Sequence, residues 1–271
     1  MRLCRAAFSA VNIESSMNDR KPFITIRNLK KIYPTQGGEL CAIQDVTFDV
    51  YRGEFITLVG PSGCGKTTLL KIISGLLPKT DGELTFSSEG DFGPGRGVGM
   101  VFQKPVLLKW RSILDNVLLP VEILRLVRQS YVAKAMELLS LVGLTGFEKS
   151  YPNELSGGMQ QRASISRALI HDPQLLLMDE PFGALDALTR EKMNLEILRI
   201  WQETQKTILF VTHGIQEAVF LADRVIVLSA RPARMVAAID VPLPRPRTME
   251  LKAEKEFGKL CLEIYRLLEE K

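Results

Sequence analysis

The sequence predicts an α/β fold in which helices cover both faces of a mostly parallel β-sheet. Short apolar runs, such as residues 55–59 and 175–178, alternate along the chain with segments of helical periodicity, which is typical of this class. The chain has 271 residues, 46% of them hydrophobic and 24% charged, a composition that excludes disordered, collagen-like and coiled-coil proteins. Its formal net charge of +4 is too small to indicate nucleic-acid binding by itself.

The first 103 residues are expected to contain four strands and one helix. Residues 55–59 form a continuous apolar run, which indicates a strand that is buried on both faces. A helix is predicted at 66–76, a turn at 35–39, and a hairpin with a loop at 81–97, where Gly and Ser are frequent. The strands are predicted at residues 23–29, 42–50, 55–59 and 99–103.

The rest of the chain predicts a helical lobe and then further alternation of strands and helices. Residues 104–159 are rich in helical patterns, strongest at 131–142, and are expected to form an inserted lobe. Helices are predicted at 160–171, 188–204 and 215–221, and strands at 175–178, 207–211 and 225–228. The chain is therefore divided into a disordered tail at 1–20, a main domain at 21–232, and a C-terminal linker and helix at 233–271.

The C-terminal segment combines a stiff linker with an amphipathic helix. Three prolines within residues 242–246 restrict the backbone there. The apolar stripe that follows has helical spacing, and such a stripe packs on its own core more often than on a partner. It consists of Phe257, Leu260, Cys261, Ile264 and Leu268.

Neither the cysteines nor the apolar runs indicate a secreted or membrane-spanning chain. The longest stretch without a charged residue runs from Phe55 to Gly65, which is too short for a transmembrane helix. Residues 1–16 lack the long apolar core of a signal peptide, and Met17 is an alternative start. Cys4, Cys41, Cys64 and Cys261 show no metal-ligand spacing, so reduced thiols in a cytoplasmic compartment are expected.

A phosphate-binding loop is predicted between the strand at 55–59 and the helix that follows it. Residues 60–67 read Gly-Pro-Ser-Gly-Cys-Gly-Lys-Thr and fit the pattern G-x-x-x-x-G-K-[ST] of P-loop NTPases. Glycines let backbone N–H groups approach phosphate oxygens, Lys66 would reach the β- and γ-phosphates, and the Thr67 hydroxyl would bind Mg²⁺. The alternative is a glycine turn that merely enters a helix. The candidate ATP-binding residues here are Gly60, Pro61, Ser62, Gly63, Cys64, Gly65, Lys66, Thr67 and Thr68.

Two carboxylates follow the apolar strand at 175–178. A buried strand delivers Asp179 and Glu180 to the carboxyl edge of the sheet, where open α/β folds bind their ligands. Asp179 would hold Mg²⁺, and Glu180 would orient and deprotonate the attacking water. A strand that simply ends in surface acids is the alternative.

A third motif lies between these two. Residues 155–162 read Leu-Ser-Gly-Gly-Met-Gln-Gln-Arg and resemble the signature motif of the ATP-binding cassette (ABC) proteins. Ser156, Gly157 and Gly158 would present a hydroxyl and open N–H groups at a helix start, which is a second anion-binding site. The resemblance implies a head-to-tail homodimer in which Ser156 of one subunit contacts the γ-phosphate held by the other. It also implies an N-terminal antiparallel β subdomain beside the parallel core sheet and helical lobe.

Further residues carry over from the resemblance one by one. Tyr33 matches the aromatic residue that stacks on adenine, and Gln103 the glutamine that contacts Mg²⁺ and the attacking water and hinges the lobe. Asp186 matches the loop that crosses the dimer interface, and His213 the histidine that contacts the γ-phosphate. The sequence departs from the family in three places, one of which is the segment 87–96, which fits no family pattern. Gly183 stands where serine is common, and Gly214 stands where aspartate is common and could alter how His213 is held.

The chain is most similar to ATPase subunits of bacterial importers of the nitrate, sulfonate and taurine type, through residues 59–67, 115–120 and 229–234. This implies hydrolysis of MgATP, separate permease subunits, a solute-binding protein and no nucleic acid. It also places the protein peripherally at the cytoplasmic face of the inner membrane. A permease helix would dock near residues 106–111, where Trp110 is either an interface residue or partly buried. Two alternatives stay open: a soluble cassette ATPase that acts on nucleic acid, and a regulatory module that binds nucleotide without hydrolysis.

Overall fold

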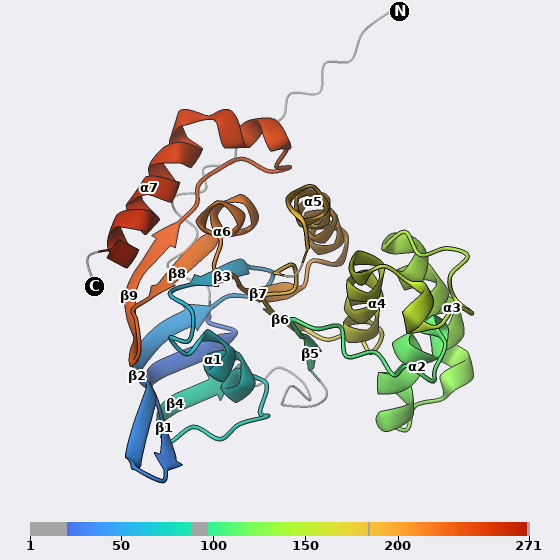
Figure 1. The fold of residues 1–271 in the computed structure, drawn as a ribbon, viewed down its shortest axis with the longest axis horizontal. Helices are drawn as coiled ribbons and strands as arrows, with labels where there is room; N and C mark the ends of the chain where they lie inside the picture. Colours follow the sequence, from blue (N-terminus) through green and yellow to red (C-terminus); the bar gives the residue numbers. More distant parts are fainter. Residues whose placement is uncertain (1–20, 88–96, 184, 270–271) are drawn as a thin grey trace, which may run out of the picture.

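Within residues 21–87, 97–183 and 185–269, which the computed structural model describes, nine strands form one twisted sheet (Figure 1). Their order is β4-β1-β2-β9-β8-β3-β7-β6-β5. Strands β5, β6, β7, β3 and β8 are mutually parallel, whereas β1 pairs antiparallel with both β2 and β4. The strands are β1 (Ile24–Thr35), β2 (Gly38–Val50), β3 (Phe55–Val59), β4 (Asp81–Phe86), β5 (Val98–Val101), β6 (Leu175–Asp179), β7 (Thr207–Val211), β8 (Arg224–Leu228) and β9 (Ala233–Asp240).

Helices cover both faces of the parallel part of the sheet, as the alternating sequence pattern predicts. α1 lies on one face, and α5, α6 and α7 lie on the other (Figure 1). Side chains of β3 alternate between the two layers. Ile56 and Leu58 pack with α1, whereas Phe55 and Val59 pack on the opposite face, so the whole strand is buried. The helices are α1 (Lys66–Ile73), α2 (Ile113–Ile123), α3 (Arg128–Leu141), α4 (Gly157–Leu169), α5 (Ala187–Thr204), α6 (Ile215–Leu221) and α7 (Lys255–Glu269).

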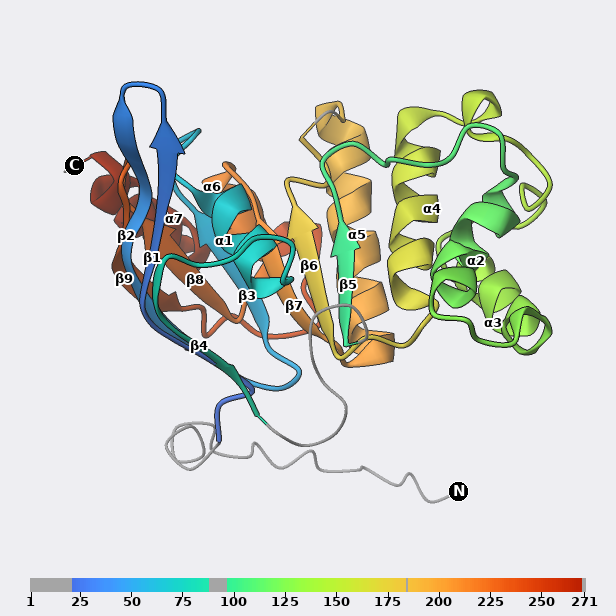
Figure 2. The ribbon, with the colours of Figure 1, turned by 90° about the horizontal axis from the view of Figure 1, so that it is seen from below.

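α2, α3 and α4 form a helical lobe beside the edge strand β5 (Figure 2). Ser112 caps α2 by accepting a hydrogen bond from the Asp115 N–H at 3.1 Å. The buried Asn116 fastens the loop before α2, because its side-chain amide donates to the carbonyls of Leu108, Arg111 and Ser112. The loop between β5 and the lobe therefore has a fixed shape.

Three sequence-based expectations differ from the structure. Residues 81–86 do not form half of a local hairpin: they are β4, which pairs with the distant β1, and residues 88–96 lie outside the described part. β9 was not predicted at all, although it pairs with both β2 and β8. The expected linker at 242–246 packs on the core, with Leu243 9% exposed. In each case a partner far away in the chain decides the structure.

The apolar stripe of the C-terminal helix faces the protein's own core, as expected. Phe257 and Ile264 on α7 are buried, and Leu260, Cys261 and Leu268 pack against the same core. In the part of the chain that the structure describes, no helix combines the length and apolarity that crossing a bilayer requires. Cys41, Cys64 and Cys261 are free thiols, whereas Cys4 and the predicted tail at 1–20 lie outside the described residues.

Candidate active site

The phosphate-binding loop connects the buried strand β3 to α1, as the sequence predicts. Gly63 and Gly65 have φ angles of 73° and 125°, a region that residues with a side chain rarely adopt. Gly60 is needed for a different reason, because a Cβ there would lie 2.9 Å from the Leu228 carbonyl oxygen. These positions let the loop close tightly above β3 and present its N–H groups at the start of α1.

Lys66 is folded back over this loop. Its Nζ donates hydrogen bonds to the carbonyl oxygens of Gly60 at 2.8 Å and Pro61 at 3.0 Å. The side chain is 4% exposed, so a cation is held at the mouth of the loop with little competition from water. A cation beside the N-terminus of a helix is suited to polyphosphate.

Thr67 and Asp179 meet across the site although they lie 112 residues apart in the sequence. The Thr67 hydroxyl donates to Asp179 Oδ1 at 2.9 Å. Asp179 ends β6 and is 8% exposed, and this burial raises the pKa of its carboxyl, while the hydrogen bond from Thr67 acts in the opposite direction. A cation beside a buried carboxylate that has one hydroxyl partner would stabilise its charged form.

This oxygen pair fits a Mg²⁺ site. Mg²⁺ prefers oxygen ligands, and in nucleotide enzymes it is held by one or two protein oxygens together with phosphates and water. Among the described residues there is no cluster of three or more His, Cys, Asp or Glu side chains. Thr67 and Asp179 therefore match a cation shared with a nucleotide better than an all-protein metal site.

Glu180 and His213 lie next to this pair at the carboxyl edge of the sheet. The His213 Nδ1 is 3.3 Å from Glu180 Oε2. Glu180 has a φ of 44°, a strained value for a residue with a long side chain, and strain of this kind is concentrated at functional sites. Its N–H donates to the Val211 carbonyl at 3.0 Å, so β7 fixes the turn that presents the carboxylate.

Gln103 is brought to the same place from β5. A Cβ on Gly183 would lie 3.5 Å from Gln103 Nε2 and 3.7 Å from Glu180 Oε2. The amide of Gln103 and the carboxylate of Glu180 therefore flank the same glycine. The structure thus gathers Gln103, Glu180 and His213 into one cluster beside Thr67 and Asp179.

Tyr33 lies at the rim of the phosphate loop. Its hydroxyl is 3.5 Å from the Thr68 Oγ1, and Lys31 Nζ lies 5.0 Å from its ring centroid. The contact with Thr68 places the Tyr33 hydroxyl beside the first turn of α1.

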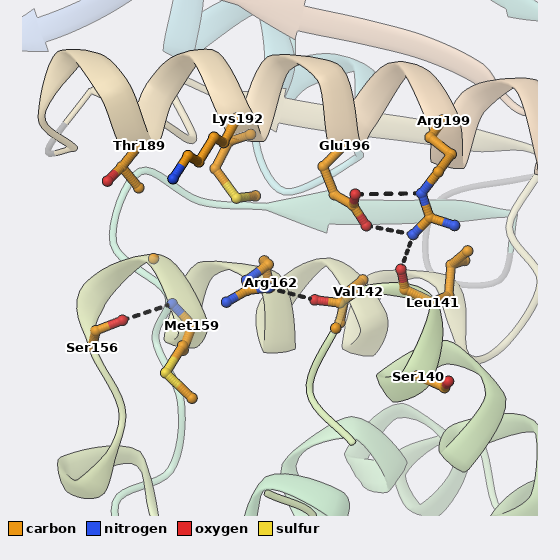
Figure 3. A pocket seen from close by; sticks show the side chains of 13 residues that line it. Ser140, Leu141, Val142, Ser156, Met159, Arg162, Thr189, Lys192, Glu196 and Arg199 are labelled. Carbon is orange, nitrogen blue, oxygen red and sulfur yellow. Dashed lines mark hydrogen bonds and ion pairs between the residues drawn. The ribbon is translucent and has the colours of Figure 1, made fainter. Parts of the chain in front are cut away.

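The signature residues lie apart from the phosphate loop. Ser156 caps α4 by accepting the Met159 N–H at 3.3 Å, and Gly157 and Gly158 form the first turn of that helix. A hollow of about 460 Å³ lies between α4 and α5. Figure 3 shows Ser156 at one end of this hollow and the Glu196–Arg199 ion pair at the other end. Asp186 caps α5 by accepting the Thr189 N–H at 3.0 Å. The structure describes no contact between these groups and the phosphate loop of the same chain.

Sequence reasoning missed several residues that hold the site together. Gln161 donates from α4 to the Phe102 carbonyl at 3.1 Å, and Arg167 donates to the carbonyls of Pro105 and Val106, both at 2.8 Å. They fasten the segment that contains Gln103 to the helix that begins with the signature. Gln161 belongs to the signature motif, but no sequence signal indicates which carbonyl it meets.

The surroundings of His213 were also missed. The Thr212 hydroxyl donates to the Glu217 carboxylate and accepts the Gly214 N–H at 2.9 Å. Glu217 is largely buried in the first turn of α6, and this burial raises the pKa of its carboxyl. An acid four residues after His213, at the start of a mostly apolar helix, is the signal that could have indicated it.

A P-loop, a Thr–Asp pair and a Glu–His pair at one sheet edge together define a nucleotide-binding protein of the P-loop NTPase class. A family model described as ABC transporter matches residues 43–183. The chain is 45% identical to the taurine import ATP-binding protein TauB of Rhizobium johnstonii, over 86% of this chain and 90% of that protein. It is 40% identical to the aliphatic sulfonates import ATP-binding protein SsuB of Bacillus cereus, over 89% of this chain and 95% of that one.

The solved structures agree with the sequence relatives. A bacterial ABC transporter cassette solved as a dimer has 31% identity and a TM-score of 0.71, covering 82% of this chain and 100% of its own. The same cassette in a post-hydrolysis state with ADP and Pi gives a TM-score of 0.69. The chain belongs to the ABC transporter family, so the fold class and the family that the sequence predicts are confirmed.

Proposed function

We propose that this chain is the ATP-hydrolysing subunit of an ABC importer for a small solute of the nitrate, sulfonate or taurine type. The observation that carries the proposal is the adjacency of the Thr67–Asp179 pair to the Glu180–His213 pair, directly beside the P-loop. The importer assignment is supported by relatives that are named as import proteins for taurine and for aliphatic sulfonates.

In this proposal the P-loop binds the phosphates of ATP through its N–H groups and Lys66. Thr67 and Asp179, with Gln103, would hold Mg²⁺, which neutralises phosphate charge when bound. Glu180 accepts a proton from a water molecule as that water attacks the γ-phosphorus and the bond to ADP breaks. His213 keeps the Glu180 carboxylate in position through Nδ1, leaving its other ring nitrogen free to face the γ-phosphate.

The second half of the proposed site comes from another copy of the chain. Ser156, Gly157 and Gly158 lie at an exposed helix end that has no contact with its own phosphate loop in the described residues. A head-to-tail homodimer would bring this helix N-terminus to the γ-phosphate bound by the partner, with Asp186 at the interface. The relative of known structure that was solved as a dimer supports this arrangement.

A permease would dock on the loop that follows Gln103. Trp110 is 74% exposed and Val106 is 59% exposed, yet Asn116 and Arg167 hold the loop in a fixed shape. Exposed apolar side chains on a rigid support are typical of an interface. We therefore propose that separate permease subunits, which work with a solute-binding protein, bind the lobe (residues 104–159) at this loop. The chain would then lie peripherally at the cytoplasmic face of the membrane.

Substitution of the carboxylate tests the catalytic part of the proposal. Glu180→Gln should still bind ATP, should lose at least about 100-fold in turnover, and should accumulate as an ATP-loaded dimer in size-exclusion chromatography. Lys66→Ala should instead lose ATP binding, measured by calorimetry. Glu256→Gln on the exposed face of α7 is the matched control. Normal turnover in Glu180→Gln would refute the assigned role.

A further inference from the structure

α6 connects the proposed catalytic histidine to the C-terminal segment. The helix begins at Ile215, two residues after His213, and has seven residues, which corresponds to a length of about 10 Å. Gly214 at its N-cap offers no side chain, so Thr212 and Glu217 hold this end. On its inner side α6 contacts β3, where the Thr57 hydroxyl donates to the Ala218 carbonyl at 3.4 Å. A movement of α6 would therefore displace the backbone that carries His213.

The other end of α6 is closed by two arginines from the C-terminal segment. Arg247 Nη1 donates to the carbonyl oxygens of Val219 and Phe220, both at 2.9 Å. Arg245 Nη2 donates to the Leu221 carbonyl at 2.8 Å. The last carbonyls of a helix have no partner within the helix, and cations are favoured at that end. The two guanidinium groups thus satisfy three successive carbonyls of one short helix.

Burial restrains Arg247, and further contacts restrain Arg245. Arg247 is 5% exposed. Burial lowers its pKa to about 9, which leaves the side chain charged at neutral pH. Arg245 pairs with Asp223 at 2.7 Å and stacks over the Trp201 ring of α5 at 4.1 Å. Asp223 in turn accepts the N–H of Phe55, the first residue of β3, at 2.9 Å.

The rest of the segment closes over the same helix. Lys252 pairs with Glu191 of α5, and its Nζ lies 4.7 Å from the ring centroid of Phe220 on α6. α7 then packs along α6 with Phe257 and Ile264 buried (Figure 1). The segment therefore joins α5, α6 and the start of β3. α6 begins two residues after His213, and β3 leads directly into the phosphate loop.

We propose that Arg245 and Arg247 are positioning residues, which fix α6 and through it the orientation of His213 toward Glu180. This inference rests on the proposed function, since it assigns the arginines an effect on ATP hydrolysis. A purely structural role would lower stability without a specific effect on turnover. The two roles are separable because the arginines contact neither the phosphate loop nor Thr67 in the described residues.

Arg247→Met tests the proposal because it keeps much of the buried side chain and removes the guanidinium that donates to the Val219 and Phe220 carbonyls. At a temperature well below unfolding we expect kcat to fall about tenfold or more, with the KM for ATP within about twofold of wild type because Lys66 and its loop are untouched. Arg247→Lys keeps the positive charge but has fewer hydrogen-bond donors, so its kcat should lie between those of wild type and the Met variant. It also serves as the test if the Met variant folds poorly. Arg266→Met, on the exposed face of α7, is the matched control and should change neither parameter.

Two further measurements distinguish positioning from general destabilisation. Hydrogen exchange should become faster at the amides of α6 and stay unchanged in α1. In a His213→Ala background, Arg247→Met should lower kcat no further, because residues that act as a unit are not additive. Equal fractional losses with and without His213, or a wild-type kcat for Arg247→Met, would overturn the inference. Normal turnover of His213→Ala alone would instead refute the catalytic role proposed for the histidine.

Discussion

Gly99, in the edge strand β5, lies where that strand passes closest to the end of α4. A Cβ at this position would lie 2.5 Å from the Ala168 carbonyl oxygen and 3.0 Å from both Leu176 Cδ1 and Pro173 Cγ. Because the nearest obstacle is helix backbone, it cannot turn aside as a side chain could. Gly99→Ala would therefore force β5 and α4 apart by about 0.8 Å to reach a normal carbon–oxygen contact.

The cost of this displacement follows from two opposing effects. Overpacking a closely packed site destabilises a protein by about 1–3 kcal/mol or more. Replacing Gly by Ala restricts the unfolded chain and returns about 0.4–1 kcal/mol. The contacts on both sides of Gly99 are tight, so we expect a net loss of about 2 kcal/mol in the free energy of unfolding.

Urea unfolding of the nucleotide-free protein measures this loss, with Gly258→Ala as the control. Gly258 lies in α7, and a methyl group added there would meet no described atom within 4 Å apart from its chain neighbours and the backbone of its own helix. Alanine should therefore stabilise the protein by about 0.5–1 kcal/mol. The two alanine variants should thus shift the urea midpoint in opposite directions. If Gly99→Ala unfolds at the same or a higher urea concentration than wild type, the close approach of β5 and α4 is wrong.

Three other substitutions or reactions test the site. Burial raises the pKa of Asp179 in the folded protein above its value of about 3.8 in the unfolded chain. The stability that this group contributes is therefore present at a pH below the unfolded pKa and is lost as the pH rises through the folded pKa. Without nucleotide at pH 7, Asp179→Asn should therefore be at least as stable to urea as wild type, and any advantage should shrink as the pH falls. MgATP should not stabilise this variant. Cys64 is 1% exposed and burial raises its pKa. Iodoacetamide should therefore alkylate Cys64 more slowly than Cys41, and more slowly still when ATP is present, as followed by mass spectrometry. Gly183→Ser would place a Cβ 3.5 Å from Gln103 Nε2, which is an ordinary contact. Stability and ATPase rate should therefore change little, and a large loss of either would contradict this geometry.

The parts of the fold that the sequence predicts are those with a strong local pattern. The run Phe55–Val59 is apolar throughout because both faces of β3 are covered, and that burial is visible without knowledge of the neighbouring strands. The phosphate loop likewise depends on glycines whose positive φ angles are a local requirement. Ser156 and Asp186 are helix caps, another local feature, but the helices that they cap begin at residues 157 and 187, earlier than the predicted starts at 160 and 188.

The parts that were missed depend on pairing at long range. β9 alternates weakly between buried and exposed residues, and its existence depends on β2 and β8 as partners on either side. Residues 81–86 alternate as any edge strand does, so the pattern could not distinguish pairing with β1 from a local hairpin. Lys66, Thr67 and Asp179 were predicted to be close because parallel strands end at one edge, whereas the contact of Gln161 with Phe102 has no such rule.

Gly214 shows why the motif alone does not describe the histidine that precedes it. The residue common at this position in the family would bring a side chain to the start of α6, and here that side chain is absent. The helix is held instead by Thr212 and Glu217 at its beginning and by Arg247 at its end, 34 residues beyond His213 in the numbering. Since Arg247 comes from a distant part of the chain, the orientation of His213 depends on tertiary packing as well as on its immediate neighbours. Substitutions confined to residues 212–214 would therefore underestimate how many residues the histidine requires.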